Sequence, residues 1–372
     1  MTKFYGQWKV NNELFDVRRD ALLHASKHGC PDIRWVWYND IWEKFDISLL
    51  GTISLDELYK RRAQQLREKY DYLILSYSGG SDSHNVLMSF INNNIKLDQI
   101  FVHMPFSIIN SSKHNPNTKD NTARNLMSEW NYVIEPTLKE LARTHPEIKI
   151  ELSDWTTQIK EDIFKKDISL NSTNVWGMGN LARSLDFSNI GQSQIDKGKT
   201  VATIYGADKP NVGKVGDKVY MYFVDRPMLL TVNNDYPTEM FYKTPDFPEL
   251  AYEMAYQVYL YFKANIHLQK FIWHEGMATD FDSTLSINNA IAKTVCYAKT
   301  WDFKKFQAEK PMQLGIGKDR DWYVYELPEF QRKQQAWNYH YADFFHGIDK
   351  KYLGVDNQFM KLRSAGFFLG II

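Results

Sequence analysis

Between residues 55 and 205 the chain alternates short apolar runs with segments whose apolar residues recur at helical spacing. The apolar runs predict a buried parallel strand at 72–77 and further strands at 99–106, 148–155 and 200–205. The helical spacing predicts helices at 55–70, from 83 to the asparagine cluster at 92–94, and at 118–143. Strands that alternate with helices favour an α/β fold with a doubly wound parallel sheet.

Single residues add detail to two of these helices. Ser54 and Glu57 form a capping-box pattern at the start of the 55–70 helix. Pro136 would clash with the preceding helical turn, so we expect a kink or break there in the 118–143 helix. The 55–70 helix also carries basic residues, which we interpret as a solvated face: Lys60, Arg61, Arg62, Arg67 and Lys69.

The two ends of the chain have weaker patterns. Residues 1–50 give no clear assignment, and the aromatic run at 35–38 is compatible with a strand or a buried edge. After Pro237 the pattern predicts a helix at 249–267 and favours helices beyond it. We therefore predict three parts: an N-terminal extension that includes the 55–70 helix (1–70), an α/β domain (71–236) and a mostly helical C-terminal lobe (237–372).

The amino-acid composition excludes several classes of protein. The 45 Lys and Arg residues balance the 45 Asp and Glu residues, so no global field attracts nucleic acid or an anionic membrane. Only Cys30 and Cys296 are present, which excludes a disulfide framework and a four-cysteine zinc site. With no apolar run of about 20 residues and no signal-like N-terminus, we expect a cytoplasmic protein without a membrane partner.

The segment 78–83, Ser-Gly-Gly-Ser-Asp-Ser, lies between a predicted strand and a predicted helix. Unpaired backbone N–H groups and the helix dipole make such a turn an anion site. Gly79 and Gly80 allow the backbone to approach the anion closely, and Ser78, Ser81 and Ser83 add hydroxyl donors. Asp82 is expected either to cap the helix or to hold a magnesium ion that bridges phosphate oxygens.

This segment resembles the SGGxDS signature of the N-type ATP pyrophosphatases, the PP-loop superfamily, which includes asparagine synthetase and the NAD synthetases. The resemblance implies an adenine nucleotide alpha hydrolase-like fold, the substrates ATP and Mg²⁺, and cleavage between the α and β phosphates. It implies that Ser78, Gly79, Gly80, Asp82 and Ser83 bind pyrophosphate, with Ser81 in the same loop. Adenine is expected near the end of the next strand, at Val102 and His103.

A second segment, 205–210, follows the last predicted strand and is similar to a phosphate-side loop of asparagine synthetase-like members. That similarity implies Asp208 as a magnesium or substrate ligand and Lys209 as a charge clamp on leaving pyrophosphate. Asp208 and Lys209 would then join Asp82 as the catalytic residues. An ordinary β-turn, with Asp and Pro in their usual roles, is an equally good interpretation.

Gly191 and the run Gly198-Lys199-Thr200 look at first like a Walker A loop. Six residues separate Gly191 from Gly198 where the motif has four, and a strand follows instead of a helix. We therefore interpret 191–200 as a surface loop.

The resemblance implies an adenylating ligase of the asparagine synthetase-like kind, in which a nitrogen nucleophile displaces AMP from a small-molecule or nucleotide substrate. Residue 2 is Thr, so the N-terminal cysteine of a glutaminase is not expected. The compact form and the many Asn and aromatic residues would suit a phage-encoded enzyme. Two alternatives stay open: a PP-loop enzyme that modifies tRNA or DNA, and a non-catalytic ATP sensor. The sequence predicts neither the acceptor nor the oligomeric state.

Overall fold

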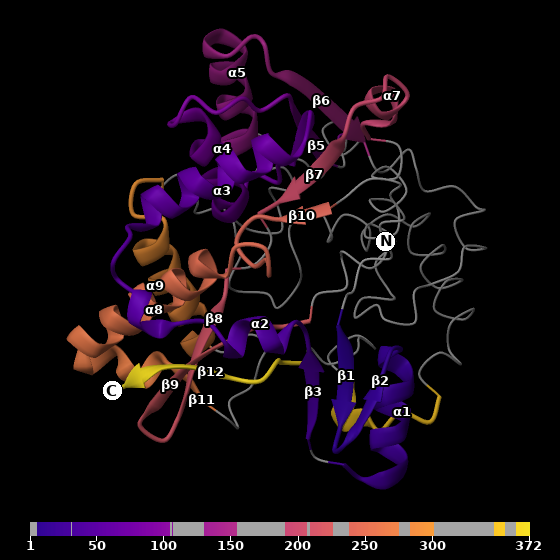
Figure 1. The fold of residues 1–372 in the computed structure, drawn as a ribbon, viewed down its shortest axis with the longest axis vertical. Helices are drawn as coiled ribbons and strands as arrows, with labels where there is room; N and C mark the ends of the chain where they lie inside the picture. Colours follow the sequence, from indigo (N-terminus) through magenta and orange to yellow (C-terminus); the bar gives the residue numbers. More distant parts are fainter. Residues whose placement is uncertain are drawn as a thin grey trace.

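The computed structural model describes the protein at residues 6–30, 32–104, 106, 130–154, 190–206, 209–225, 238–274, 283–300, 346–353 and 362–372. Its central element is a parallel five-stranded sheet with strand order β10-β7-β4-β5-β6 (Figure 1). The strands are β4 (Tyr72–Ser76), β5 (Gln99–Met104), β6 (Lys149–Asp154), β7 (Val201–Tyr205) and β10 (Thr238–Met240). The four strands predicted from the apolar runs are confirmed, and β10 is an addition to them.

The helices next to this sheet begin and end close to the predicted positions. They are α3 (Leu55–Lys69), α4 (Ser81–Ile91), α5 (Glu135–Thr144) and the short α7 (Gln192–Ile195). The Ser54 side chain accepts a hydrogen bond from the Glu57 backbone N–H at 3.3 Å, as the capping box predicts. A π-helical turn, Trp130–Ile134, becomes an α-helix at Glu135, so the break falls beside Pro136, and residues 118–129 lie outside the described residues.

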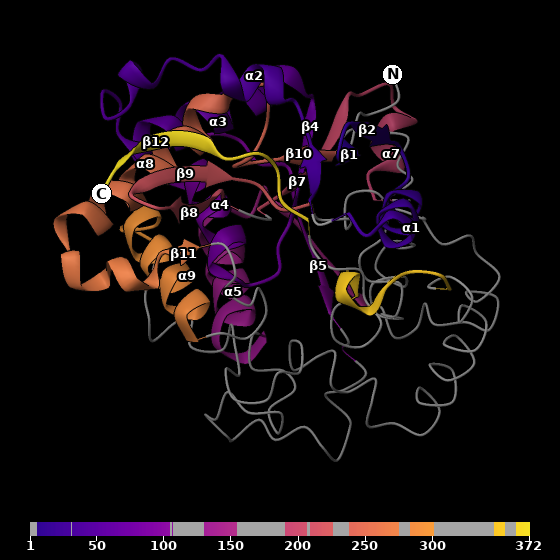
Figure 2. The ribbon, with the colours of Figure 1, turned by 90° about the horizontal axis from the view of Figure 1, so that it is seen from below.

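Both faces of β4 are covered, which explains its continuous apolar run. Leu73 and Leu75 belong to the main core, together with residues of α3 and α4. Ile74 belongs to a second cluster with Ile190, and Ile195 of α7 packs against that cluster. In two views α3 and α4 lie on one side of β7, and α7 lies on the other (Figures 1 and 2). The fold is therefore an α/β fold with a doubly wound parallel sheet.

The strand order brings the ends of β4 and β7 together. From β4 the chain winds outward through β5 to β6, then returns to β7 on the other side of β4. Ser76 pairs with Tyr205, so both strands end at the same level. This reversal is a topological switch point, where open α/β sheets bind ligands at the carboxyl ends of their strands.

Two smaller sheets flank the central one. An antiparallel sheet near the N-terminus has the order β2-β1-β3 and packs with α1. A second sheet has the order β11-β8-β9-β12. Their elements are β1 (Gln7–Val10), β2 (Glu13–Phe15), α1 (Arg18–His28), β3 (Ile33–Val36), β8 (Asn211–Val215), β9 (Lys218–Tyr222), β11 (Trp273–His274) and β12 (Phe367–Ile371).

The described residues after 236 contain both helices and strands. The predicted helix at 249–267 is α8 (Pro248–Ala264), followed by a 3-10 helix at Ile266–Phe271 and by α9 (Ser283–Cys296). The strand β10 pairs with β7 of the central sheet, and β12 pairs with β9. The division of the chain at residue 236 stays a prediction. Within the described residues, no helix is long and apolar enough to cross a membrane.

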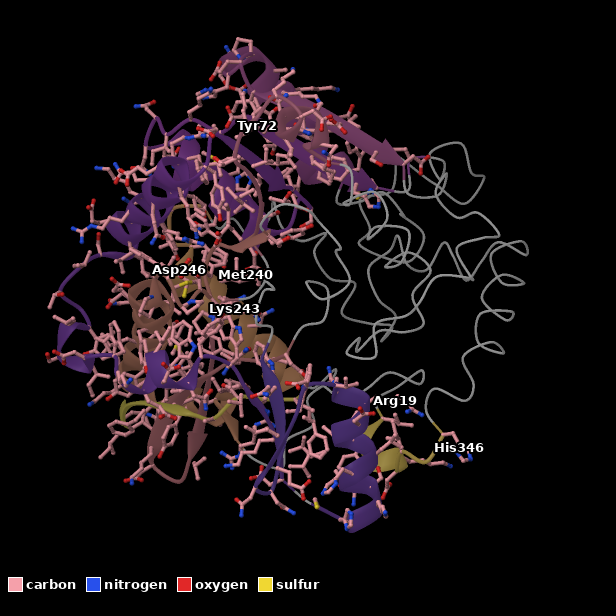
Figure 3. All side chains as sticks on the ribbon, turned by 45° about the vertical axis from the view of Figure 1, so that its right-hand side comes forward. Arg19, Tyr72, Met240, Lys243, Asp246 and His346 are labelled. Atoms are coloured by element: carbon pink, nitrogen blue, oxygen red, sulfur yellow. The ribbon has the colours of Figure 1, made fainter. Side chains whose placement is uncertain are left out.

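The N-terminal part shares the main core with the rest of the chain. Arg18 is fully buried, and its Nη1 lies 2.9 Å from Asp225 Oδ2, to which the Trp8 indole also donates at 2.9 Å. The segment at His346 lies beside α1, near Arg19 (Figure 3), where the Asp349 N–H donates to Ser26 Oγ at 2.8 Å. Residues from the beginning and end of the chain therefore hold each other in place.

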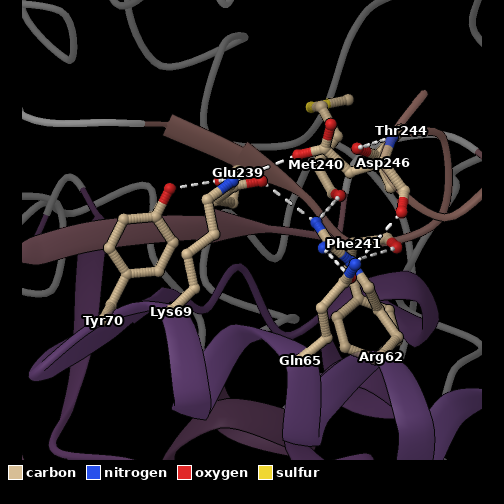
Figure 4. A network of polar contacts seen from close by, with 9 residues as sticks. All are labelled: Arg62, Gln65, Lys69, Tyr70, Glu239, Met240, Phe241, Thr244 and Asp246. Carbon is tan, nitrogen blue, oxygen red and sulfur yellow. Dashed lines mark hydrogen bonds and ion pairs between the residues drawn. The ribbon is translucent and has the colours of Figure 1, made fainter.

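A buried ion pair joins α3 to β10 and corrects one interpretation. Arg62, which we expected on a solvated face, is fully buried, with its Nη2 3.0 Å from Glu239 Oε2 (Figure 4). Lys69 Nζ lies 3.1 Å from the other Glu239 oxygen, and the Tyr70 hydroxyl donates to the same carboxylate. Arg62 is four residues after Leu58 and four before Leu66, so helical spacing puts it on the apolar stripe.

Candidate functional site

The 78–83 loop leaves the carboxyl end of β4 and begins α4 directly. Gly79 has φ of 77°, a left-handed conformation that glycine adopts without strain, and Gly80 is the N-cap residue of α4. The loop is closed by its own serines: Ser83 Oγ donates to the Gly80 carbonyl at 3.0 Å, and the Ser78 N–H donates to Ser83 Oγ at 3.3 Å. The local sequence therefore builds a tight strand-loop-helix turn, which is the geometry expected of an anion site.

Gly206 lets the end of β7 come close to this loop. A Cβ atom on Gly206 would lie 2.8 Å from Ser83 Cα and 2.9 Å from the Asp82 carbonyl oxygen, so any side chain would force the two segments apart. The close approach carries the following residues to the loop, where Lys209 Nζ lies 3.4 Å from Asp82 Oδ1. The two segments singled out in the sequence are thus neighbours in space.

Asp208 and Ala207 lie outside the described residues, so the predicted role of Asp208 stays a prediction. Lys209 is mostly buried, with a side chain about 10% exposed. Its predicted role as a clamp on pyrophosphate stays a prediction.

Asp82 is held as a charged carboxylate. Burial acts to raise the pKa of Asp82, but the ammonium groups of Lys209 and Lys293 and a hydrogen bond from Tyr297 lower it to about 2. The carboxylate therefore stays ionised near neutral pH and can bind either a metal cation or the ammonium group of a lysine.

Two tyrosines that the sequence analysis did not single out also hold Asp82. The Tyr242 hydroxyl, just after β10, donates to the Asp82 carbonyl at 2.7 Å. The Tyr297 hydroxyl, just after α9, donates to Asp82 Oδ1 at 2.7 Å. Burial raises the pKa values of both phenols well above 10, so both remain donors. No sequence signal marks them, because each lies more than 150 residues from Asp82 along the chain.

Asn85 extends this network along α4. Its Nδ2 donates to the Tyr242 hydroxyl at 3.1 Å, and its Oδ1 accepts from Thr300 Oγ1 at 2.8 Å. The first turn of α4 is therefore connected to β10 and to the residues that follow α9.

The residues predicted to contact adenine, Val102 and His103, belong to β5, the strand next to β4. The Tyr77 N–H donates to the Phe101 carbonyl at 2.9 Å, so the chain after β4 runs alongside the end of β5. Val102 has no exposed surface, and a contact between it and adenine would have to use its backbone. His103 is 7% exposed and stacks on Phe101 with ring centroids 5.8 Å apart.

The 191–200 loop is not at this site. The backbone N–H and the hydroxyl of Thr200 donate hydrogen bonds to the Asp71 carboxylate. These residues lie at the amino ends of β7 and β4, at the edge of the sheet opposite to the 78–83 loop. Lys199 lies over the Tyr72 ring, with Nζ 5.2 Å from its centroid. These contacts agree with the interpretation of 191–200 as a surface loop.

A magnesium ion would depend on few protein ligands. The described residues contain no group of three His, Cys, Asp or Glu side chains that could hold a metal. Mg²⁺ at nucleotide sites is commonly bound by one or two carboxylates and by substrate phosphates. The ionised Asp82 carboxylate fits that requirement, with Asp208 as the predicted second ligand.

Comparisons with known proteins do not identify a family for this chain. No family model and no curated protein match the chain. One solved structure that is similar is the NH3-dependent NAD synthetase from Campylobacter jejuni subsp. jejuni NCTC 11168, in complex with the nitrate ion. It is 11% identical, the match covers 68% of this chain and 96% of that one, and the TM-score is 0.29. The function is therefore inferred from the site itself.

Proposed function

We propose that the protein is an ATP-dependent ligase that forms AMP and pyrophosphate. The observation that carries this proposal is the 78–83 loop at the switch point, with Gly79 left-handed, Gly80 capping α4 and Lys209 beside Asp82. The SGGxDS pattern resembles the PP-loop signature, and from that resemblance we assign to this anion site the cleavage of ATP between the α and β phosphates.

In the proposed reaction the backbone N–H groups and serine hydroxyls of the loop bind the β and γ phosphates of ATP. An oxygen of the acceptor substrate bonds to the α phosphorus, and the bond from that phosphorus to the bridging oxygen breaks. Pyrophosphate leaves, and a nitrogen nucleophile then displaces AMP from the adenylated acceptor. The loop and Lys209 stabilise the negative charge that develops on the leaving pyrophosphate.

Asp82 and Lys209 change partners in this scheme. Lys209 now lies 3.4 Å from Asp82, and it would exchange that carboxylate for a phosphate when ATP binds. Asp82, with Asp208, would hold Mg²⁺, which supplies neutralisation of the phosphate oxygens when bound. The reaction requires no protein nucleophile.

The test follows the label of α-labelled ATP in the presence of magnesium, with and without a cell extract as the source of acceptor. The proposal predicts labelled AMP, and Asp82→Ala should lower the rate by about 100-fold or more, as for loss of an electrostatic stabiliser. Asp71→Ala is the matched control, because this exposed carboxylate lies at the opposite edge of the sheet. Labelled ADP, or tight ATP binding without turnover, would contradict the proposal and favour a kinase-like enzyme or a sensor.

Two ATP analogues locate the bond that breaks. β,γ-Methylene-ATP keeps the oxygen between the α and β phosphates and should still give AMP. α,β-Methylene-ATP lacks that oxygen and should bind without reacting. Equal turnover of both analogues would exclude cleavage between the α and β phosphates.

A further inference from the structure

Asp82 is held at two points by residues that are far away in the sequence. Tyr242 donates to its backbone carbonyl and Tyr297 donates to its carboxylate, each at 2.7 Å. Within the described residues, both donors that reach the carboxylate, Tyr297 and Lys209, bind the same oxygen, Oδ1. The other oxygen, Oδ2, is therefore the one left for a cation.

The position of Tyr297 is fixed by its neighbours. Its ring packs on Tyr242 with centroids 5.7 Å apart, and Tyr242 meets Tyr59 edge to face at 6.1 Å. The Tyr59 hydroxyl donates to the carbonyl of Cys296, the residue before Tyr297, at 2.8 Å. Thr300 then bonds to Asn85 in the first turns of α4. The chain on both sides of Tyr297 is thus anchored independently of Asp82.

A carboxylate at the start of a helix can rotate and offer either oxygen to a ligand. A hydrogen bond from a rigid neutral donor to one oxygen restricts this rotation without competing for the second oxygen. Groups that orient ligands in this way typically change metal affinity or activity by about 10- to 100-fold when they are removed.

We propose that Tyr297 is a positioning residue for the reaction proposed above: its hydroxyl holds Asp82 Oδ1 so that Oδ2 binds the divalent cation that accompanies ATP. This inference rests on the proposed function. It assigns a role in the nucleotide site to the residues that follow α9, more than 200 positions after the loop.

The test compares Tyr297→Phe with Tyr59→Phe, and measures the affinity for α,β-methylene-ATP by calorimetry in excess Mg²⁺ and in EDTA. Both variants lose one buried hydroxyl of the same aromatic cluster, but only Tyr297 contacts Asp82. Tyr297→Phe should weaken binding in Mg²⁺ by about 10-fold, with binding in EDTA unchanged. Tyr59→Phe should lose less than Tyr297→Phe in Mg²⁺, because its hydroxyl acts on Asp82 only indirectly, through the Cys296 carbonyl and Tyr297, and it should be unchanged in EDTA. Thermal unfolding of each variant checks that it is folded.

Several outcomes would overturn the inference, and they can be distinguished. If the wild type gains affinity from Mg²⁺ and Tyr297→Phe keeps that gain, Tyr297 has no positioning role and the proposed function survives. If Tyr59→Phe loses as much as Tyr297→Phe, packing and not the hydroxyl explains the effect. If the wild type does not bind the nucleotide at all, the proposed function fails together with the inference.

Discussion

Two glycine-containing loops of this protein carry similar residues and differ in their place on the sheet. The 78–83 loop follows β4, begins an 11-residue helix and reaches the switch point between β4 and β7. The 191–200 loop contains a four-residue helix and leads into the amino end of β7. The 78–83 loop has the left-handed Gly79 and, as a neighbour in space, Lys209. The 191–200 loop has the left-handed Gly198 and contains Lys199.

The difference between the loops is the edge of the sheet that they occupy. In a parallel sheet all carboxyl ends meet at one edge, so the first loop gains as neighbours Lys209 and two tyrosines that follow β10 and α9. The second loop is at the amino edge, where Thr200 and Lys199 contact Asp71 and Tyr72 at the start of β4. Glycine and lysine alone therefore do not build the arrangement proposed for the first loop, because residues at the ends of neighbouring strands must contribute to it.

The largest difference in the rate of AMP formation is expected between variants of Lys209 and Lys199. Lys209→Ala should lower the rate of AMP formation by about 100-fold, because it removes the cation beside the loop. Lys199→Ala should leave the rate unchanged, since Lys199 contacts the Tyr72 ring at the other edge. If both variants lost the same fraction of the rate in a labelled-ATP assay, the two loops would not differ in the way proposed.

The next difference concerns two glycines. Gly206→Ala would place a Cβ atom against the backbone of Asp82 and Ser83, and overpacking of this kind costs about 1 to 3 kcal/mol of stability. Gly198→Ala meets no atom within 4 Å, but its φ of 80° costs about 1 to 2 kcal/mol.

The two variants have similar expected costs in stability, so ATP affinity is the measurement that distinguishes them. Gly206→Ala should lose ATP affinity, since the loop must shift, and Gly198→Ala should keep it. Thermal unfolding and ATP titration of both proteins give the two readouts. A Gly206→Ala protein with normal ATP affinity would show that the close approach is not needed.

The pH dependence of Asp82 should appear only in acid. Its pKa is lowered from 3.8 to about 2, so its ion pair with Lys209 is fully present above about pH 4 and is lost as the pH falls towards 2. We expect ATP binding to show no titration of this group between pH 5 and 8. A chemical shift titration of the Asp82 carboxyl carbon measures its pKa, and a midpoint near 4 would contradict the described contacts.

The smallest effect is expected at Asp71. Hydrogen bonds from the Thr200 backbone and hydroxyl lower the pKa of Asp71, so these bonds are lost as the pH falls through its lowered pKa. Asp71→Ala should speed hydrogen exchange of the Thr200 amide and leave ATP affinity unchanged. A loss of ATP affinity in this variant would mean that the amino edge does influence the site.

The sequence predicts the middle of the fold better than its ends. Strands β4, β5 and β7 are recognisable because they are buried in a parallel sheet, whereas the edge strand β6 has no buried residue. Helix α3 has a visible cap. β10 and β11 have only three and two residues, too few for a periodic signal. Their partners are also distant in the sequence.

The same limit applies to the site. The 78–83 loop is recognisable because its groups are consecutive, and Gly206 and Lys209 could be suspected from their place after a strand. Tyr242 and Tyr297 could not, because a tyrosine in an aromatic-rich chain is usually part of a core. Their role depends on a three-dimensional contact with Asp82.

The separation of 215 positions between Asp82 and Tyr297 has a consequence for biosynthesis. At about 5 to 20 residues per second, the ribosome needs roughly 10 to 40 seconds to extend the chain from one residue to the other. During that interval the loop has been synthesised, but the hydroxyl that binds its carboxylate has not. The proposed nucleotide site is therefore completed late in translation, after the strands that carry its loop.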